Sequence, residues 1–125
     1  MKKINKKMMK NLSFPDFEVE KMEFSSQEKT LRIFVEGAWL DIDGGSKLGK
    51  GVLLFTGWET LSITKFNSNT QKWSPLEEFS AQPLKDLCEV KFFDSTVSLS
   101  GFSKETGQWI EWKIVNTKMC AEFNL

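Results

Sequence analysis

Hydrophobic and polar residues alternate along most of the chain, and this period of two is typical of β-strands that bury one face. The segment 109–115, "WIEWKIV", places Ile110, Trp112 and Ile114 on one side and Trp109 on the other. The segments "FEVEKMEF", "TLRIFVEGAWL" and "TLSITKF" alternate in the same manner. If only one face of each strand is buried, at least one of Trp109 and Trp112 is partly exposed.

Turn residues separate these segments at short intervals. The joins "FFDSTV" and "FSKETGQW" are typical of tight hairpins, and Gly107 in the second can adopt a positive φ. The segment "PLEEFSAQPLKDL" is the only plausible helix, and Pro83 limits it to a short one. We therefore predict a mostly β fold: a single-domain antiparallel meander forming a sandwich or half-barrel, with at most one short helix near residues 75–82.

The charge of the chain is zero overall but unevenly placed. Five of the 17 basic residues and none of the 17 acidic ones lie in the first ten positions, so residues 11–125 carry 12 basic and 17 acidic side chains, a net charge of −5. We interpret residues 1–13 as a basic flexible tail and residues 14–125 as one β-rich globular domain. The tail is either a solvated leader or a segment that touches nucleic acid or an anionic membrane by charge alone. The acidic remainder argues against nucleic-acid binding by the folded domain.

Targeting signals and cysteines point to a cytoplasmic protein. No apolar run of seven residues follows the lysines before Pro15, which argues against a secretory signal, and no window approaches 18 apolar residues, so we expect no membrane span. Cys88 and Cys120 lie in strand-like apolar runs without CxxC spacing. We expect two reduced core residues, with a disulfide as the alternative.

The segment 41–51, "DIDGGSKLGKG", resembles two known ligand-binding loops. It has the GxxxxGK spacing of a phosphate-binding loop, but Gly51 replaces the Ser or Thr that holds magnesium, and a strand-like run follows instead of a helix. As a calcium loop it lacks the terminal glutamate, because Val52 occupies that position. We therefore predict an exposed hairpin connection and expect neither a cofactor nor a metal.

The chain contains no histidine, which removes the His-based triads, His-ligated metal sites and the commonest general base. Cys88 would then lack an imidazole to activate it as a nucleophile. A pair of carboxylates in a cleft is the remaining catalytic alternative, but nothing singles out such a pair among 17 acidic residues. We expect a protein that is not an enzyme. The five tryptophans either fill the core or, where exposed, stack on sugar rings or nucleobases.

The order of the segments resembles that of a group of small β-rich bacterial proteins that includes immunity proteins of polymorphic-toxin systems. The resemblance covers residues 14–123 and is carried by "FPDFEVEKMEF", "KTLRIFVEG", "VLLFTGWETLSITKF", "CEVKFFDSTVSLSGF" and "WIEWKIVNTKMCAEF". These families begin with an aromatic residue, a His-Asp pair and a strand. Asp16 matches the aspartate, whereas Pro15 stands where histidine is expected.

The resemblance implies a non-catalytic protein-binding module that covers a basic toxin or nuclease. Acidic residues on exposed loops and edges would then meet the basic partner, and exposed tryptophans would anchor it. The residues we expect in these contacts are Asp41, Asp43, Trp58, Glu59, Trp73, Glu77 and Glu78. The alternative function is a small-ligand or carbohydrate-binding β-domain that uses exposed tryptophans.

Overall fold

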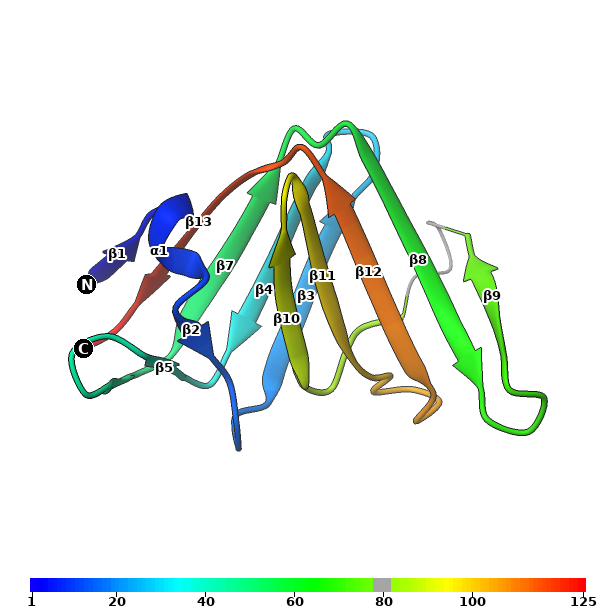
Figure 1. Cartoon of the computed structure of the whole chain (residues 1–125), viewed down its shortest axis with the longest axis horizontal. Helices are drawn as coiled ribbons and strands as arrows, with labels where there is room; N and C mark the ends of the chain where they lie inside the picture. The colour runs from blue at the N-terminus through cyan, green and yellow to red at the C-terminus, as the bar shows by residue number, and fades with distance from the viewer. Residues whose placement is uncertain (78–81) are drawn as a thin grey trace.

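Two five-stranded antiparallel sheets form the body of the protein in the computed structural model, which describes residues 1–77 and 82–125 (Figure 1). The first sheet has the order β1 (Lys2–Ile4), β13 (Lys118–Phe123), β7 (Gly51–Thr56), β4 (Thr30–Val35) and β3 (Val19–Ser25). The second has the order β10 (Glu89–Phe93), β11 (Thr96–Phe102), β12 (Trp109–Val115), β8 (Thr60–Asn67) and β9 (Lys72–Leu76). A small sheet contains β2 (Leu12–Ser13), β5 (Ala38–Leu40) and β6 (Ser46–Leu48). The predicted mostly β, antiparallel, sandwich-like domain is confirmed.

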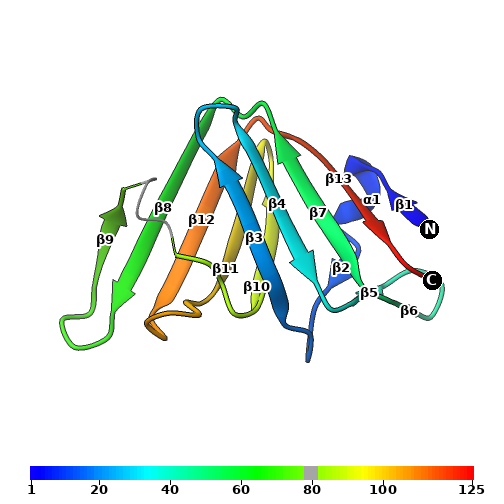
Figure 2. The ribbon, with the colours of Figure 1, turned by 180° about the vertical axis from the view of Figure 1, so that it is seen from behind.

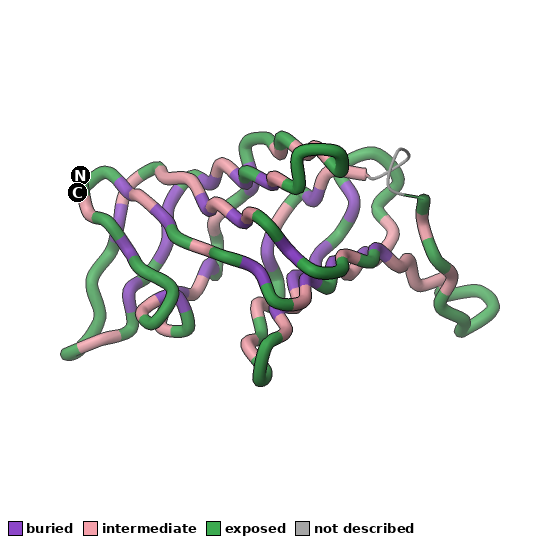
Figure 3. The backbone as a smooth tube through the Cα atoms, turned by 90° about the horizontal axis from the view of Figure 1, so that it is seen from above, coloured by how far each residue is buried: buried purple, intermediate pink, exposed green. Residues whose placement is uncertain are grey.

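The core lies between the inward faces of the sheets, as the alternation predicts. In β12, Ile110, Trp112 and Ile114 are buried, whereas Trp109 is half-buried on the opposite face. Figure 3 shows the same alternation of buried and more exposed positions along the strands. Each large apolar side chain that is fully buried stabilises the fold by about 1.5–3 kcal/mol.

The predicted turns are also confirmed. β10 and β11 are joined by a two-residue turn in which Asp94 has φ 52°, and Gly107 has φ 73° in the turn between β11 and β12. The segment 41–51, expected to be one exposed connection, is so only in part: residues 41–45 connect β5 to β6, with φ 51° at Asp43 and 91° at Gly44, whereas 46–48 form β6 and Gly51 begins β7. Because β7 follows this hairpin, no helix N-terminus is available there to bind phosphate.

The first 13 residues are part of the fold, contrary to the expected flexible tail. β1 pairs with β13, with Lys2 opposite Phe123, and β2 pairs with β5. Between them lies α1 (Lys6–Met9), capped by the side chain of Asn5. Ile4 is 1% exposed and Met9 is 2% exposed. The apolar residues between the lysines therefore bury themselves while the ammonium groups stay outside, so the basic charge sits on an ordered surface.

The helix expected near residues 75–82 does not begin at Pro75, because Pro75 and Leu76 belong to β9. β9 is an edge strand of the second sheet, where proline is tolerated because one side of the strand needs no hydrogen bonds. Residues 78–81 lie outside the described part of the chain. Among residues 1–77 and 82–125, no helix is long and apolar enough to cross a membrane.

Residues 82–88, the crossing segment, connect the two sheets (Figure 2). The N–H of Val19 in β3 donates to the carbonyl oxygen of Lys85 at 2.8 Å, and the N–H of Lys85 donates to that of Phe102 in β11 at 2.7 Å. Isolated bridges pair Glu18 with Asp86 and Leu84 with Ser103. This segment therefore fixes the edge of the first sheet against the second.

Candidate functional site

The predicted contact residues lie in three separate parts of the molecule. Asp41 and Asp43 are exposed on the β5–β6 turn, and Glu59 is exposed between β7 and β8. Trp73 lies on β9 and is 51% exposed, and Glu77 is exposed directly after that strand. Glu78 lies outside the described residues. These positions do not form one surface.

Trp58 is 4% exposed and is therefore not an available anchor, which corrects the expectation that it is exposed. Its ring stacks on that of Phe24 with centroids 6.1 Å apart, and Phe24 in turn meets Trp112 edge-on at 5.2 Å. Gly57, at φ 62°, turns the chain back just before Trp58. A tryptophan in a turn is usually exposed, but here the turn folds over the end of the core.

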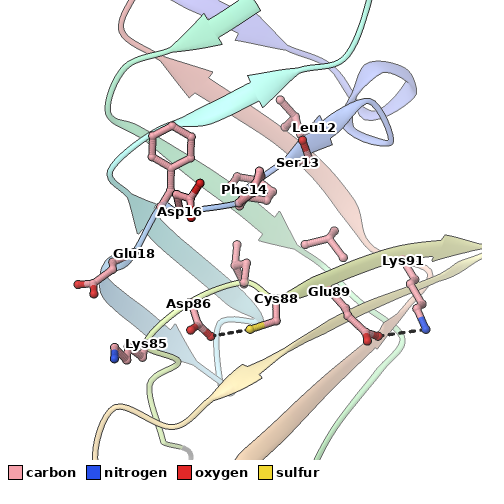
Figure 4. Close-up of a pocket in the computed structure, with 14 residues that line it drawn as sticks. Leu12, Ser13, Phe14, Asp16, Glu18, Lys85, Asp86, Cys88, Glu89 and Lys91 are labelled. Carbon is pink, nitrogen blue, oxygen red and sulfur yellow. Dashed lines mark hydrogen bonds and ion pairs between the residues drawn. The ribbon is translucent and has the colours of Figure 1, made fainter. Parts of the chain in front are cut away.

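A groove of about 770 Å³ is a prominent concave feature of the described residues (Figure 4). One wall is formed by residues 12–18, which comprise β2 and the link from it to β3, and the other by residues 85–91, the end of the crossing segment and the start of β10. Leu12, Phe14 and Leu87 line it while being buried, so their apolar surfaces form its deeper part. Its volume is within the roughly 300–1,000 Å³ typical of binding sites.

The rim of the groove is acidic. Four carboxylates, Asp16, Glu18, Asp86 and Glu89, and two ammonium groups, those of Lys85 and Lys91, line it, giving a net charge of −2. The Nζ of Lys91 lies 3.1 Å from the Oε2 of Glu89, and this pair neutralises itself. The excess negative charge therefore belongs to Asp16, Glu18 and Asp86 against a single Lys85.

Hydrogen bonds position the key groups of the rim. The Oδ1 of Asp86 accepts the backbone N–H of Phe102 at 3.1 Å, which holds this carboxylate in place. The backbone N–H of Glu18 donates to the Oε1 of Glu36 at 2.7 Å. Asp16, with φ 66°, follows Pro15 in the turn that leads into β3. Because the acidic side chains are attached to a fixed backbone, the groove is largely preformed.

β10 presents a free edge to this groove. It pairs with β11 on one side, and within the described residues no strand pairs with it on the other. In an antiparallel pair, alternate residues point their N–H and C=O groups away from the partner strand. Val90 and Lys91, which lie on this strand, also line the groove, so the free edge borders it.

Cys88 and Cys120 are free and exposed, which corrects the prediction of core residues. Cys120 alternates with the buried Ala121 and so lies on the outer face of the first sheet. Cys88 lies in the groove, where its thiol donates to the Oδ1 of Asp86 at 3.1 Å. Partial burial of this thiol, then the hydrogen bond to Asp86 and the charges of Asp86 and Glu89, raise the pKa of Cys88 to about 11.

The groove does not activate Cys88 as a nucleophile. Cys88 is protonated near neutral pH, and a thiol is a far weaker nucleophile than a thiolate. In the described part of the chain, no three His, Cys, Asp or Glu side chains are grouped so that they could hold a metal ion. The groove thus offers acidic charge, apolar surface and a sheet edge.

Sequence reasoning missed the groove because its walls are about 70 residues apart in the chain. Only the family resemblance points to Asp16, and Glu18, Asp86 and Glu89 carry no local signal. Comparison with known proteins adds no assignment: the chain matches no protein-family model, no curated protein and no solved structure.

Proposed function

We propose that this protein is a non-catalytic protein-binding domain whose groove holds an extended, basic segment of a partner. The observation that carries the proposal is the free edge of β10, which lies in the wall of an acidic groove of about 770 Å³. A sheet edge and a charged rim together specify both the conformation and the charge of the occupant.

The backbone supports an extended occupant. An unpaired strand edge offers a row of N–H and C=O groups, and a peptide can add to it as a further strand. β10, Glu89–Phe93, provides such an edge for a segment of similar length. Side chains of the added strand would alternate between the apolar depth of the groove, near Phe14 and Leu87, and its rim.

The charges support a basic occupant. A lysine or arginine in the groove would meet Asp16 and Glu18 on one wall and Asp86 on the other. Complementary charges select partners and speed association more than they add affinity. The net charge of −5 on residues 11–125 acts over longer distance in the same direction, although the five lysines of the ordered N-terminal segment polarise the surface.

The biological role proposed with this site is inhibition of a basic toxin or nuclease, which is what the resemblance to immunity proteins implies. A cytoplasmic location belongs to this proposal. Asp41, Asp43 and Glu59 lie outside the groove, and so do Trp73 and Glu77. They remain proposed contacts of a partner large enough to extend beyond it.

The test uses two labelled peptides, one alternating lysine with valine and one alternating glutamate with valine, and follows binding by fluorescence anisotropy. We expect the lysine peptide to bind saturably and more weakly at high salt, and the glutamate peptide not to bind. The double variant Asp16→Asn/Glu18→Gln should lower the affinity about tenfold, in line with loss of one or two charge-assisted contacts, and asparagine tolerates the positive φ of Asp16.

The matched control is Asp41→Asn/Asp43→Asn, which also removes two negative charges but on the β5–β6 turn. Asparagine tolerates the positive φ of Asp43, so this variant keeps the turn. The control should bind like the natural chain. Equal weakening by both double variants would show that only net charge matters, and absence of binding to the lysine peptide would reject the groove as the site.

A further inference from the structure

Four aromatic side chains form a continuous row across the second sheet, on the face turned away from the core. Phe102 on β11 is opposite Trp109 on β12, Trp109 is opposite Phe66 on β8, and Phe66 is opposite Trp73 on β9. Directly opposed residues in an antiparallel sheet point to the same face. Since Ile110 next to Trp109 is buried in the core, the whole row faces outward.

The aromatic row is partly open to solvent and consists of two pairs of packed rings. Phe102 is 44% exposed and Trp73 is 51% exposed. The rings of Phe102 and Trp109 pack edge-to-face at 5.1 Å and 82°, and those of Phe66 and Trp73 pack tilted at 5.2 Å and 56°. Contiguous exposed apolar surface of this kind is uncommon and marks binding sites.

A hollow of about 450 Å³ lies beside three rings of the aromatic row, those of Phe66, Phe102 and Trp109. The turns at 67–69 and 106–108 supply the rest of its lining, which consists of amide, hydroxyl and backbone groups. The side chains of Asn69 and Gln108 make no hydrogen bond to other described residues, so both amides can serve a ligand. Among the described residues, no charged side chain lines the hollow.

We propose that this hollow binds a neutral saccharide of one or two rings. A sugar ring has an apolar C–H face that stacks on an aromatic ring and hydroxyl groups that pair with amides and hydroxyls. The uncharged lining disfavours phosphates and carboxylates, which need cationic partners. The edge-to-face packing leaves no flat platform of successive rings, so a short saccharide fits and a long polysaccharide does not.

This site is independent of the proposed protein-binding groove. Within residues 1–77 and 82–125, none lines both concavities, and the hollow lies at the β8–β9 and β11–β12 turns, at one end of the second sheet (Figure 1). Failure of either proposal therefore leaves the other unaffected.

The test is an NMR titration of the full chain with glucose, N-acetylglucosamine, maltose and cellobiose. We expect at least one of them to shift the Trp109 indole and Gly107 amide signals saturably, with a dissociation constant in the millimolar range or tighter. Trp109→Ala, which lacks the indole signal, should abolish the shift of the Gly107 amide signal. Gln108→Ala, which leaves the aromatic row intact, should weaken binding about tenfold through loss of a hydrogen bond to the ligand.

The matched control is Trp39→Ala, which removes a tryptophan that is 37% exposed on β5 and lies outside the hollow. It should leave the titration unchanged. The proposal is overturned if no saccharide shifts the signals of the hollow, if Trp39→Ala and Trp109→Ala weaken binding equally, or if only a proline-rich peptide produces saturable shifts, which would assign the hollow to a peptide.

Discussion

Gly101 lies in direct contact with the backbone of Asp86. A Cβ placed on Gly101 would come within 2.2 Å of the Asp86 carbonyl oxygen and 2.7 Å of its Oδ1. The same Oδ1 accepts the N–H of Phe102, the residue after Gly101. The crossing segment therefore rests on β11 at a point where only glycine leaves enough space, and this contact positions one wall of the groove.

Replacing Gly101 with alanine should lower the free energy of unfolding by about 1–3 kcal/mol, because the added methyl group must push the crossing segment away. The same variant should weaken binding of the lysine–valine peptide, because Lys85 and Asp86 move with the crossing segment. Urea denaturation and the anisotropy titration measure the two effects. Gly107→Ala is the control: it has φ 73° but open space, so it should cost about 1 kcal/mol and leave peptide binding intact.

Cys88 should react slowly with iodoacetamide at neutral pH, and its rate should rise about tenfold per pH unit until the pH approaches the pKa of about 11. The measurement uses a Cys120→Ser background, so that one thiol reacts. Asp86→Asn removes a negative charge beside the thiol and should increase the rate near pH 8. A rate that levels off near the ordinary thiol pKa of 9.0 would contradict the contact with Asp86.

The same thiol affects stability in alkaline solution. Its pKa is raised from 9.0 to about 11 on folding, so the unfolded chain loses this proton first as the pH rises. The contribution to the free energy of unfolding is complete below pH 9 and is lost between pH 9 and 11. Cys88→Ser should remove this part of the pH dependence. The comparison variant Cys120→Ser should retain it.

Substitution of Trp58 should lower the free energy of unfolding far more than substitution of Trp73. Trp58→Ala removes a buried ring that packs on Phe24 and should lower the free energy of unfolding by about 3–5 kcal/mol. Trp73→Ala removes a half-exposed ring on an edge strand and should change it by less than about 1 kcal/mol. Thermal and urea denaturation compare the two. Equal stabilities would mean that the β7–β8 turn does not fold over the core.

The N-terminal segment should contribute to stability. Ile4→Ala creates a cavity under β1 and should lower the free energy of unfolding by about 2–5 kcal/mol. Lys3→Ala, one residue earlier on the exposed side of the same strand, should have an effect within about 0.5 kcal/mol. If both variants have the same free energy of unfolding as the natural chain, residues 1–13 do not contribute to the stability of the fold.

The strands and hairpins of the sandwich can be predicted because their signals are local. Alternation marks the buried side of β4, β8 and β12. Gly107 marks a turn, because its positive φ is one that few other residues adopt easily. The N-terminal segment escapes prediction because its apolar residues are too few to show a period. Trp58 escapes because a turn residue becomes buried only through contacts with distant strands.

The candidate sites differ in how far local patterns reveal them. Trp109 and Phe102 occupy outward positions in amphipathic strands, so an exposed aromatic residue at such a position is a signal that sequence can carry. The row itself depends on strand register, which alternation does not specify. The groove depends on the meeting of residues 12–18 with 85–91, and no local pattern indicates that meeting.

The pairing of Lys2 with Phe123 has a kinetic consequence. These residues are 121 positions apart, yet they are neighbours in the first sheet, and the two ends of the chain lie side by side in Figure 3. Closing so long a loop is entropically unfavourable before the contact forms, and folding slows as average contact separation rises. The second sheet, built from sequential hairpins apart from the β8–β12 pairing, can form earlier. We therefore expect β1 and β13 to join late in folding, with the lowest φ-values of the domain.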